Sequence, residues 1–300
     1  MTESRTNQVV VGVDGSPGSV VALQWAVAEA ERRKAALVVV RATSGPRDWN
    51  EAQFSPIPPI AHQEFDALAA DDLESTLEEM LGPEAARRVT RVVERGDAEE
   101  VLVGQAESAR VLVVGRRGWH KGLFPGSTAE DVARHAACPV VIVPNEPPSE
   151  PGPEQGRVVV AVGETAHSAA TLEFAFDEAS FRGKGLTAVH VSNALPPDAA
   201  SWRASAPDAA LLREYQLEEQ RALAEALAGW AEKYPDVEVQ KDALPGDPVS
   251  TVIQASAGAA LLVVGSHYRS RLRSLRLNSV AHSALHHATC PVAIIPAAAE

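Results

Sequence analysis

The chain has few of the residues that build disulfide-stabilised, aromatic-rich or membrane-spanning proteins. It contains two cysteines and two methionines among 300 residues, and aromatic side chains make up 5% of it. Two cysteines cannot form the framework of several bridges that stabilises small secreted domains. No apolar run approaches the ~20 residues of a transmembrane helix, and the opening segment MTESRTNQ is polar, unlike a signal peptide. We therefore expect a soluble cytoplasmic protein.

An excess of basic residues is also lacking. Lys and Arg number 27 against 40 Asp and Glu, so the formal net charge is −13, and both halves of the chain are acidic. Binding to a nucleic-acid backbone requires a basic surface that neutralises phosphates. The charge balance therefore argues against a nucleic-acid partner, as the lack of long apolar runs argues against a membrane.

The composition is otherwise that of a soluble globular protein. Hydrophobic residues make up 45% of the chain and charged residues 22%, which is ordinary for this class. Three hundred residues are enough for two domains that each bury a core of their own.

The chain contains one domain twice. VVVGVDGS at residues 9–16 returns as VVVAVGET at 158–165, VLVVGRRG at 111–118 as LLVVGSHY at 261–268, and HAACPVVIVP at 135–144 as HATCPVAIIP at 287–296. Because equivalent positions of the two copies are about 150 residues apart throughout, this is a duplicated domain and not a short-period solenoid. We expect domains over residues 1–144 and 157–300. Residues 145–156, rich in proline and acidic side chains, are expected to form an extended, exposed linker.

Each copy alternates short β-branched runs with long amphipathic segments, which is typical of a parallel sheet covered by helices. In the first copy we expect strands at Gln8–Val13, Ala36–Ala42, Val89–Glu94, Val111–Gly115 and Val140–Val143, and helices at Ser16–Lys34, Ala61–Leu81, Asp97–Ser108 and Ser127–His135. In the second copy we expect strands near Arg157–Val162, Leu186–Val191, Val237–Lys241, Leu261–Gly265 and Val292–Ile295, and a long helix at Pro207–Tyr234.

Two loops of the first copy carry residue types suited to a phosphorylated ligand. Asp14-Gly15-Ser16 follows the first strand, and Gly115-Arg116-Arg117-Gly118 follows the fourth, before Gly126-Ser127-Thr128 opens a helix. Parallel sheets bind ligands beyond the carboxyl ends of their strands. Glycines allow close backbone approach, a helix N-terminus offers N–H groups to phosphate, and arginines add charge. By residue type alone, ordinary turns explain these glycines equally well.

Taken together, VVVGVDGS, VVGRRG followed by GST, and CPVVIVP resemble the universal stress protein family. The resemblance covers both copies, so the chain looks like a tandem member of the UspA type. It implies an α/β fold of two flavodoxin-like (adenine-nucleotide alpha hydrolase-like) domains, each with five parallel strands in the order 3-2-1-4-5. It also implies that ATP, alone or with Mg²⁺, binds between the first and fourth strands through the glycine pattern G-x2-G-x9-G-[S/T].

The resemblance also implies roles for individual residues of the first copy. Asp14 would bond the adenine edge beside Val13, and Ala42 would lie near the nucleoside. The residues expected to approach the ribose and hold the phosphates are Gly115, Arg117, Gly118, Gly126, Ser127 and Thr128.

Both copies depart from the family pattern. In the first, seven residues, WHKGLFP, separate Gly118 from Gly126 where the pattern has nine. In the second, the spacing is kept, but Gly163 replaces Asp14, Tyr268 replaces Gly118, and Asn278 stands where glycine is expected before Ser279. The four arginines of RSRLRSLR in that loop could bind an anion, but a solvated basic face is the favoured interpretation. We therefore expect one ATP site, in the first copy, and a degenerate second copy.

Other patterns are weaker. His282 and His286 have the four-residue spacing of a two-histidine metal site, but an ordinary surface pair is the favoured interpretation, and no metal site is predicted. No nucleophile–base or paired-carboxylate arrangement is present, so no catalytic residue is assigned. At most we expect a slow ATPase.

The fifth strands, VVIV and VAII, are apolar edge strands, and an exposed apolar edge favours pairing. The family pairs such strands antiparallel, so the resemblance implies an intramolecular pseudo-dimer of the two domains, with a homodimer as a further expectation. Two functions remain open: a cytoplasmic ATP-binding protein of the stress response, or a nucleotide-independent scaffold or regulatory protein that acts through protein partners.

Overall fold

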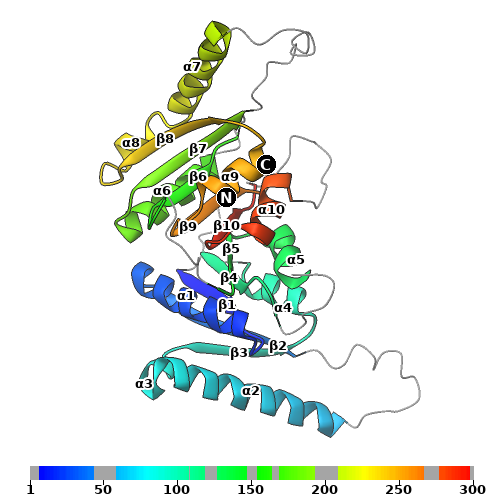
Figure 1. Cartoon of the computed structure of the whole chain (residues 1–300). Coiled ribbons are helices and arrows are strands. Elements are labelled where there is room, and N and C mark those ends of the chain that lie inside the picture. Colours follow the sequence, from blue (N-terminus) through cyan, green and yellow to red (C-terminus); the bar gives the residue numbers. More distant parts are fainter. Residues whose placement is uncertain are drawn as a thin grey trace, which may run out of the picture. The chain divides into compact units, whose positions relative to one another are not determined.

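The computed structural model describes residues 7–43, 59–107, 109–118, 127–146, 154–163, 169–192, 209–266 and 277–297. The chain divides into two compact units (Figure 1). The first is formed by Met1–Asn145 with Arg273–Leu275, and the second by Glu146–Leu272 with Arg276–Glu300. Each unit is an α/β structure with a parallel sheet, which confirms the predicted fold class at this level.

In the first unit the central strand is β1 (Gln8–Gly12), which pairs in parallel with β2 on one side and β4 on the other. The strands lie in the order β3-β2-β1-β4-β5. The other strands are β2 (Ala36–Thr43), β3 (Thr90–Arg95), β4 (Val111–Gly115) and β5 (Val140–Val143). The helices are α1 (Pro17–Arg33), α2 (Pro59–Leu81), α3 (Pro83–Ala86), α4 (Ala98–Gln105) and α5 (Ser127–His135).

The second unit repeats this arrangement around β6 (Val158–Ala161), which pairs in parallel with β7 and β9. Its strands lie in the order β8-β7-β6-β9-β10. The other strands are β7 (Leu186–Ser192), β8 (Val239–Pro245), β9 (Leu261–Gly265) and β10 (Val292–Ile295). The helices are α6 (Ala169–Arg182), α7 (Ala209–Ala226), α8 (Trp230–Lys233), α9 (Pro248–Ala255) and α10 (Ser279–His287).

The central strands are buried on both faces, which explains why they read as unbroken apolar runs. Val9, Val10 and Val11 of β1 are fully buried, as are Leu112 and Val113 of β4. Helix α1 packs on the neighbouring strands β1 and β4, and helix α2 packs on the neighbouring strands β2 and β3. Alternating polar residues would have no solvent face to occupy in such a sheet.

Helix α1 begins and ends at recognisable signals. The Ser16 hydroxyl accepts a hydrogen bond from the Ser19 amide at 3.2 Å, and Pro17 occupies the first turn. At the other end, Lys34 adopts the left-handed conformation with φ of 50°. The corresponding residue after α6 is Gly183, with φ of 59°. The same bend is therefore made by a lysine in one unit and by a glycine, which adopts it without steric cost, in the other.

Two sequence-based expectations are corrected. The helix expected over Pro207–Tyr234 is two helices, α7 and α8, because Gly229 has φ of 82° and breaks the helical path. Part of the segment expected to be an exposed linker is also buried. Glu154 is 7% exposed, and its carboxylate accepts a hydrogen bond from the Thr187 hydroxyl at 2.6 Å. This end of the segment is therefore anchored to the second unit.

None of the described helices combines the length and the apolar character needed to cross a membrane.

Candidate functional site

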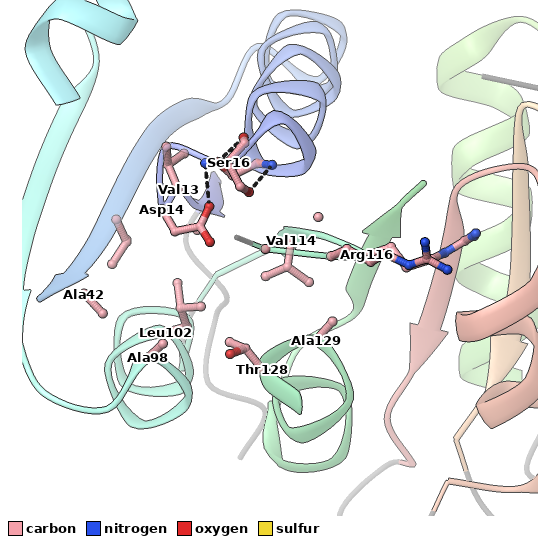
Figure 2. A pocket seen from close by; sticks show the side chains of 16 residues that line it. Val13, Asp14, Ser16, Ala42, Ala98, Leu102, Val114, Arg116, Thr128 and Ala129 are labelled. Atoms are coloured by element: carbon pink, nitrogen blue, oxygen red, sulfur yellow. Dashed lines mark hydrogen bonds between the residues drawn. The ribbon is translucent and has the colours of Figure 1, made fainter. Parts of the chain in front are cut away.

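A cavity of about 200 Å³ lies at the carboxyl ends of β1, β2 and β4 in the first unit (Figure 2). Helices α4 and α5, which pack against each other, contribute its other side. Its lining residues are Gly12, Val13, Asp14, Ser16, Ser19, Val40, Ala42, Ala98, Leu102, Val114, Gly115, Arg116, Arg117, Gly118, Thr128 and Ala129. The cavity therefore sits where the strand order reverses, which is the usual ligand position in an open parallel sheet.

The turn after β1 holds the carboxylate of Asp14 at the cavity. Oδ1 of Asp14 accepts a hydrogen bond from the Ser16 amide at 2.9 Å, and Gly15 has φ of 79°. Asp14 is exposed, and Figure 2 shows its carboxylate pointing toward the side of the cavity on which Leu102 and Thr128 lie. The turn thus orients the carboxylate while leaving it accessible from the cavity.

Glycines allow the loops after β1 and β4 to pack directly on each other. A Cβ added at Gly115 would lie 2.6 Å from the Gly18 carbonyl oxygen, and one at Gly18 would meet the Arg117 carbonyl oxygen. A Cβ at Gly118 would lie 2.6 Å from Oδ2 of Asp14. Real side chains do not tolerate such distances. These glycines are therefore required by the packing of the two loops, and Gly118 also keeps open the space beside the carboxylate.

The apolar floor of the cavity comes from α4 and was not predicted from the sequence. Leu102 is 5% exposed, and Ala98 lies one turn before it. Leu102 fits because Gly12 has no side chain: a Cβ there would lie 2.9 Å from a Leu102 methyl carbon. A glycine inside an otherwise β-branched strand was the available signal, since it marks a close approach.

Most of the predicted site residues lie together at this cavity. Val13, Asp14, Ala42, Gly115, Arg117, Gly118 and Thr128 all line it. Ser127 is the first residue of α5, but its side chain and all of Gly126 lie outside the described part of the chain, as does the shortened loop. The side chain of Arg116, considered as a further phosphate contact, extends away from the Asp14 carboxylate in Figure 2.

The corresponding crevice of the second unit has a histidine bonded to the strand tip. Val162 occupies the place of Val13, and its carbonyl oxygen lies 2.9 Å from Nδ1 of His190. Nε2 of His190 lies 2.8 Å from a carboxylate oxygen of Glu219. The ring of His190 therefore joins the strand-tip carbonyl of Val162 to the carboxylate of Glu219. Among the described residues, no side chain bonds the Val13 carbonyl in this way.

Asn278 completes the contrast at the start of α10. Its Oδ1 accepts a hydrogen bond from the Ala281 amide at 2.7 Å, so it caps the helix. Its Nδ2 donates to the Gly265 carbonyl oxygen, also at 2.7 Å, at the tip of β9. The Asn278 side chain therefore occupies an amide group of the helix N-terminus and also connects the helix to the strand. A further difference is Gly163, which has no carboxylate to offer.

The histidine pair on α10 has a close geometry. The rings of His282 and His286 lie 4.7 Å apart between centroids, in an edge-on arrangement. The contact joins two imidazoles that lie one helical turn apart on α10.

Both units are parallel α/β domains, and the first has a cavity at the tips of its two central strands. The universal stress protein family model matches the chain twice, over residues 6–144 and 155–296. The chain belongs to the universal stress protein family, and the two matches make it a tandem member.

Curated relatives are similar to the chain over nearly their whole length. Universal stress protein Rv1996 of Mycobacterium tuberculosis is 32% identical over 315 residues, covering 98% of this chain and 96% of the relative. Universal stress protein Rv2623 of the same species is 32% identical over 292 residues, covering 95% of each chain. The similarity therefore extends through both units.

Solved structures support the fold. A universal stress protein from Archaeoglobus fulgidus matches with a TM-score of 0.60 at 19% identity, covering 97% of this chain and 98% of that one. A half-length universal stress protein solved in complex with cAMP matches 48% of this chain at 25% identity with a TM-score of 0.35. The first match concerns the fold, and the second is too distant to assign any residue here.

Proposed function

We propose that the first unit binds an adenine nucleotide, ATP in the first instance, and that the protein acts in a stress response through this bound state. The observation that carries the proposal is the meeting of Asp14, the Gly115–Gly118 segment and the start of α5 at one cavity. A carboxylate that accepts from an adenine amino group, and helix amides that bind phosphate, are the two contacts an adenine nucleotide needs.

The cavity fits such a ligand in its chemistry. Leu102, Ala98 and Ala42 give it apolar walls for a base, and Gly118 leaves space that a side chain would fill. Arg117 is exposed at the same edge and supplies positive charge for phosphates. Gly126, Ser127 and Thr128 would hold phosphate oxygens at the start of α5, with Mg²⁺ as a companion of the phosphates.

The second unit does not bind ATP in the same manner under this proposal. Its crevice has Gly163 in place of the carboxylate, and Asn278 and His190 bond to backbone groups at the two strand tips. A nucleotide would have to displace these bonds without gaining the contact to Asp14. One site per chain is therefore expected.

Equilibrium dialysis with labelled ATP tests the proposal. The intact protein is expected to bind one ATP per chain, and Asp14→Ala should weaken binding roughly 10- to 100-fold, because a hydrogen bond to a charged group is lost. The matched control is Asp71→Ala, which removes an exposed carboxylate of α2 that does not line the cavity. Absence of binding at millimolar ATP would contradict the proposal.

The alternative is a nucleotide-independent scaffold that acts through protein partners. The loop between Gly118 and Gly126, two residues shorter than the family spacing, favours it. Partners captured equally by the intact protein and Asp14→Ala, with and without ATP, would support this alternative. A slow ATPase would require phosphate release that Gly118→Tyr abolishes.

The assembly of the two units belongs to the proposal as well. We propose that each unit is flavodoxin-like, that β5 and β10 pair antiparallel within one chain, and that the protein works in the cytoplasm, as a single chain or as a homodimer of such chains. The apolar sequences VVIV and VAII support pairing, since both strands lie at the edge of their own unit's strand order. A single cooperative calorimetric transition is expected. Independent melting of two halves in an elongated particle contradicts it.

A further inference from the structure

The two units differ where their second helices cross the ends of the second and third strands. In the first unit, Thr43 of β2 pairs in register with Arg95 of β3. Both side chains bond to Asp66 of α2: the Thr43 hydroxyl donates to Oδ1 at 2.8 Å, and the Arg95 guanidinium donates to Oδ2 at 2.5 Å. A charged bridge therefore joins the helix to the strand ends at this corner.

In the second unit the corresponding pair cannot form that bridge. Ser192 of β7 pairs in register with Pro245 of β8, so a serine replaces the threonine and a proline replaces the arginine. A cavity of about 200 Å³ occupies this corner, between α7 and the two strands. Figure 1 shows α7 beside the ends of β7 and β8.

The walls of this corner cavity are mostly apolar. Ala243, Leu244 and Pro245 line it from β8, and Tyr215 lines it from α7. Burying a small ring against such walls is favourable by about 25 cal/mol for each Å² removed from water. The polar groups at the cavity are Ser192, Gln216 and Glu219, enough to orient a ligand but few in number.

The single charged side chain among the described lining residues is Glu219. Its Oε2 is held by Nε2 of His190 at 2.8 Å, and its Oε1 makes no hydrogen bond to any described residue. The pair is largely withdrawn from solvent, since the exposed fractions of the two side chains are 8% for His190 and 20% for Glu219. The cavity therefore offers a fixed acceptor to a hydrogen-bond donor, whereas a carboxylate or phosphate would face like charge.

We propose that the corner cavity is a second ligand site, separate from the nucleotide crevice, for a small ring compound that carries a hydrogen-bond donor. The ring packs against Leu244, Pro245 and Tyr215, and the donor, a hydroxyl or an ammonium group, bonds to Glu219. Nucleotides and other anions are excluded from it by the same carboxylate.

Three compounds with one ring and different head groups test this site on the full-length protein. Benzyl alcohol, benzylamine and benzoate are each followed by saturation-transfer NMR at millimolar concentration. The alcohol, the amine or both should bind, and benzoate should bind roughly tenfold more weakly or not at all. Binding of the alcohol alone or the amine alone identifies the donor that the cavity prefers.

Pro245→Arg places the first unit's residue at this corner and should remove the signals by filling the cavity. Gln240→Arg is the matched control, because it adds the same charge at an exposed position of β8 that does not line the cavity. Glu219→Gln is a second, milder variant, which removes the negative charge and should therefore reduce the difference in binding strength between benzoate and the alcohol. A circular-dichroism spectrum checks that each variant is folded.

Three results would overturn the proposal. They are no binding of either donor compound, binding that persists unchanged in Pro245→Arg, or benzoate that binds as tightly as the alcohol in the unmodified protein. None of these results depends on whether the first unit binds ATP.

Discussion

The two crevices of this protein are built on one plan but differ in what their strand tips contact. In the first, Asp14 and the glycines at 115 and 118 face a cavity. In the second, His190 bonds to the Val162 carbonyl, and Asn278 bonds to the Gly265 carbonyl and to an amide of α10. Buried polar groups must find partners, because an unsatisfied one costs about 1–3 kcal/mol. A backbone carbonyl at a strand tip that contacts no ligand is therefore expected to bond with a side chain of its own chain.

The largest expected effect comes from moving a residue of the second crevice into the first. Gly118→Tyr copies Tyr268, and even its Cβ would lie 2.6 Å from Oδ2 of Asp14. We expect ATP affinity to fall at least ~100-fold, because the carboxylate must move and the cavity is filled. Isothermal calorimetry measures the loss.

The control is Gly104→Tyr in α4. A Cβ at Gly104 meets nothing within 4 Å, so the same substitution there should leave ATP binding unchanged. Equal losses in both variants would mean that the crevice geometry does not determine binding.

The next largest effect is expected at equivalent positions of the second strand in each unit, His190 in β7 and Arg41 in β2. His190→Leu should lower the free energy of unfolding by about 2–3 kcal/mol, because the Val162 carbonyl and the Glu219 carboxylate lose their shared hydrogen-bonding partner. Arg41→Leu, at the corresponding position of β2, should cost at most about 1 kcal/mol, since its partner Asp72 is 58% exposed. Urea unfolding followed by circular dichroism measures both, and similar costs would remove the distinction between the two positions.

A smaller effect is expected at the start of α10. Asn278→Ala should destabilise the protein by roughly 1–2 kcal/mol, because the helix loses its cap and its tie to Gly265. Asn278→Ser retains a capping oxygen but cannot reach the strand, so it should recover about half of that loss. A serine variant as unstable as the alanine variant would show that the tie to Gly265 carries the whole effect.

The smallest expected effect concerns the bends after α1 and α6. Lys34→Gly should stabilise the protein by up to about 1 kcal/mol, and Gly183→Lys should destabilise it by a similar amount, because both positions have φ between 50° and 59°. Thermal unfolding compares the two. Opposite signs are required, and a loss in both variants would mean that the backbone conformation is not the deciding factor.

The strands were predictable because the central ones are buried on both faces and therefore appear in the sequence as short unbroken apolar runs. The bounds of β4 and β5, and those of α5, are the predicted ones. The break at Gly229 was missed, since a single glycine among good helix formers costs only about 1 kcal/mol and does not by itself end a helix. The left-handed φ of that glycine is a property of the folded chain.

The candidate site was predictable where residues follow strand ends, as Asp14 and Gly118 do. The position of Leu102 at the cavity was not predictable, because it depends on how α4 packs against Gly12, about ninety residues away in the chain. The entropy of closing a loop depends only weakly on its length, so the sequence separation does not indicate which distant residue will be the partner. For the same reason, the sequence suggested a phosphate-binding role for Gly115 and gave no indication that Gly115 packs against Gly18. Contacts between distant segments decide which glycine serves a ligand and which serves the fold.

The double bonding of Asn278 has an evolutionary consequence. A chain that acquires glycine at this position loses the helix cap and the tie to Gly265 at once. Under the proposed function, Gly163 offers no carboxylate to a nucleotide, so ligand binding does not compensate for that loss. A second binding site would then have to evolve through a less stable intermediate that selection for binding does not favour.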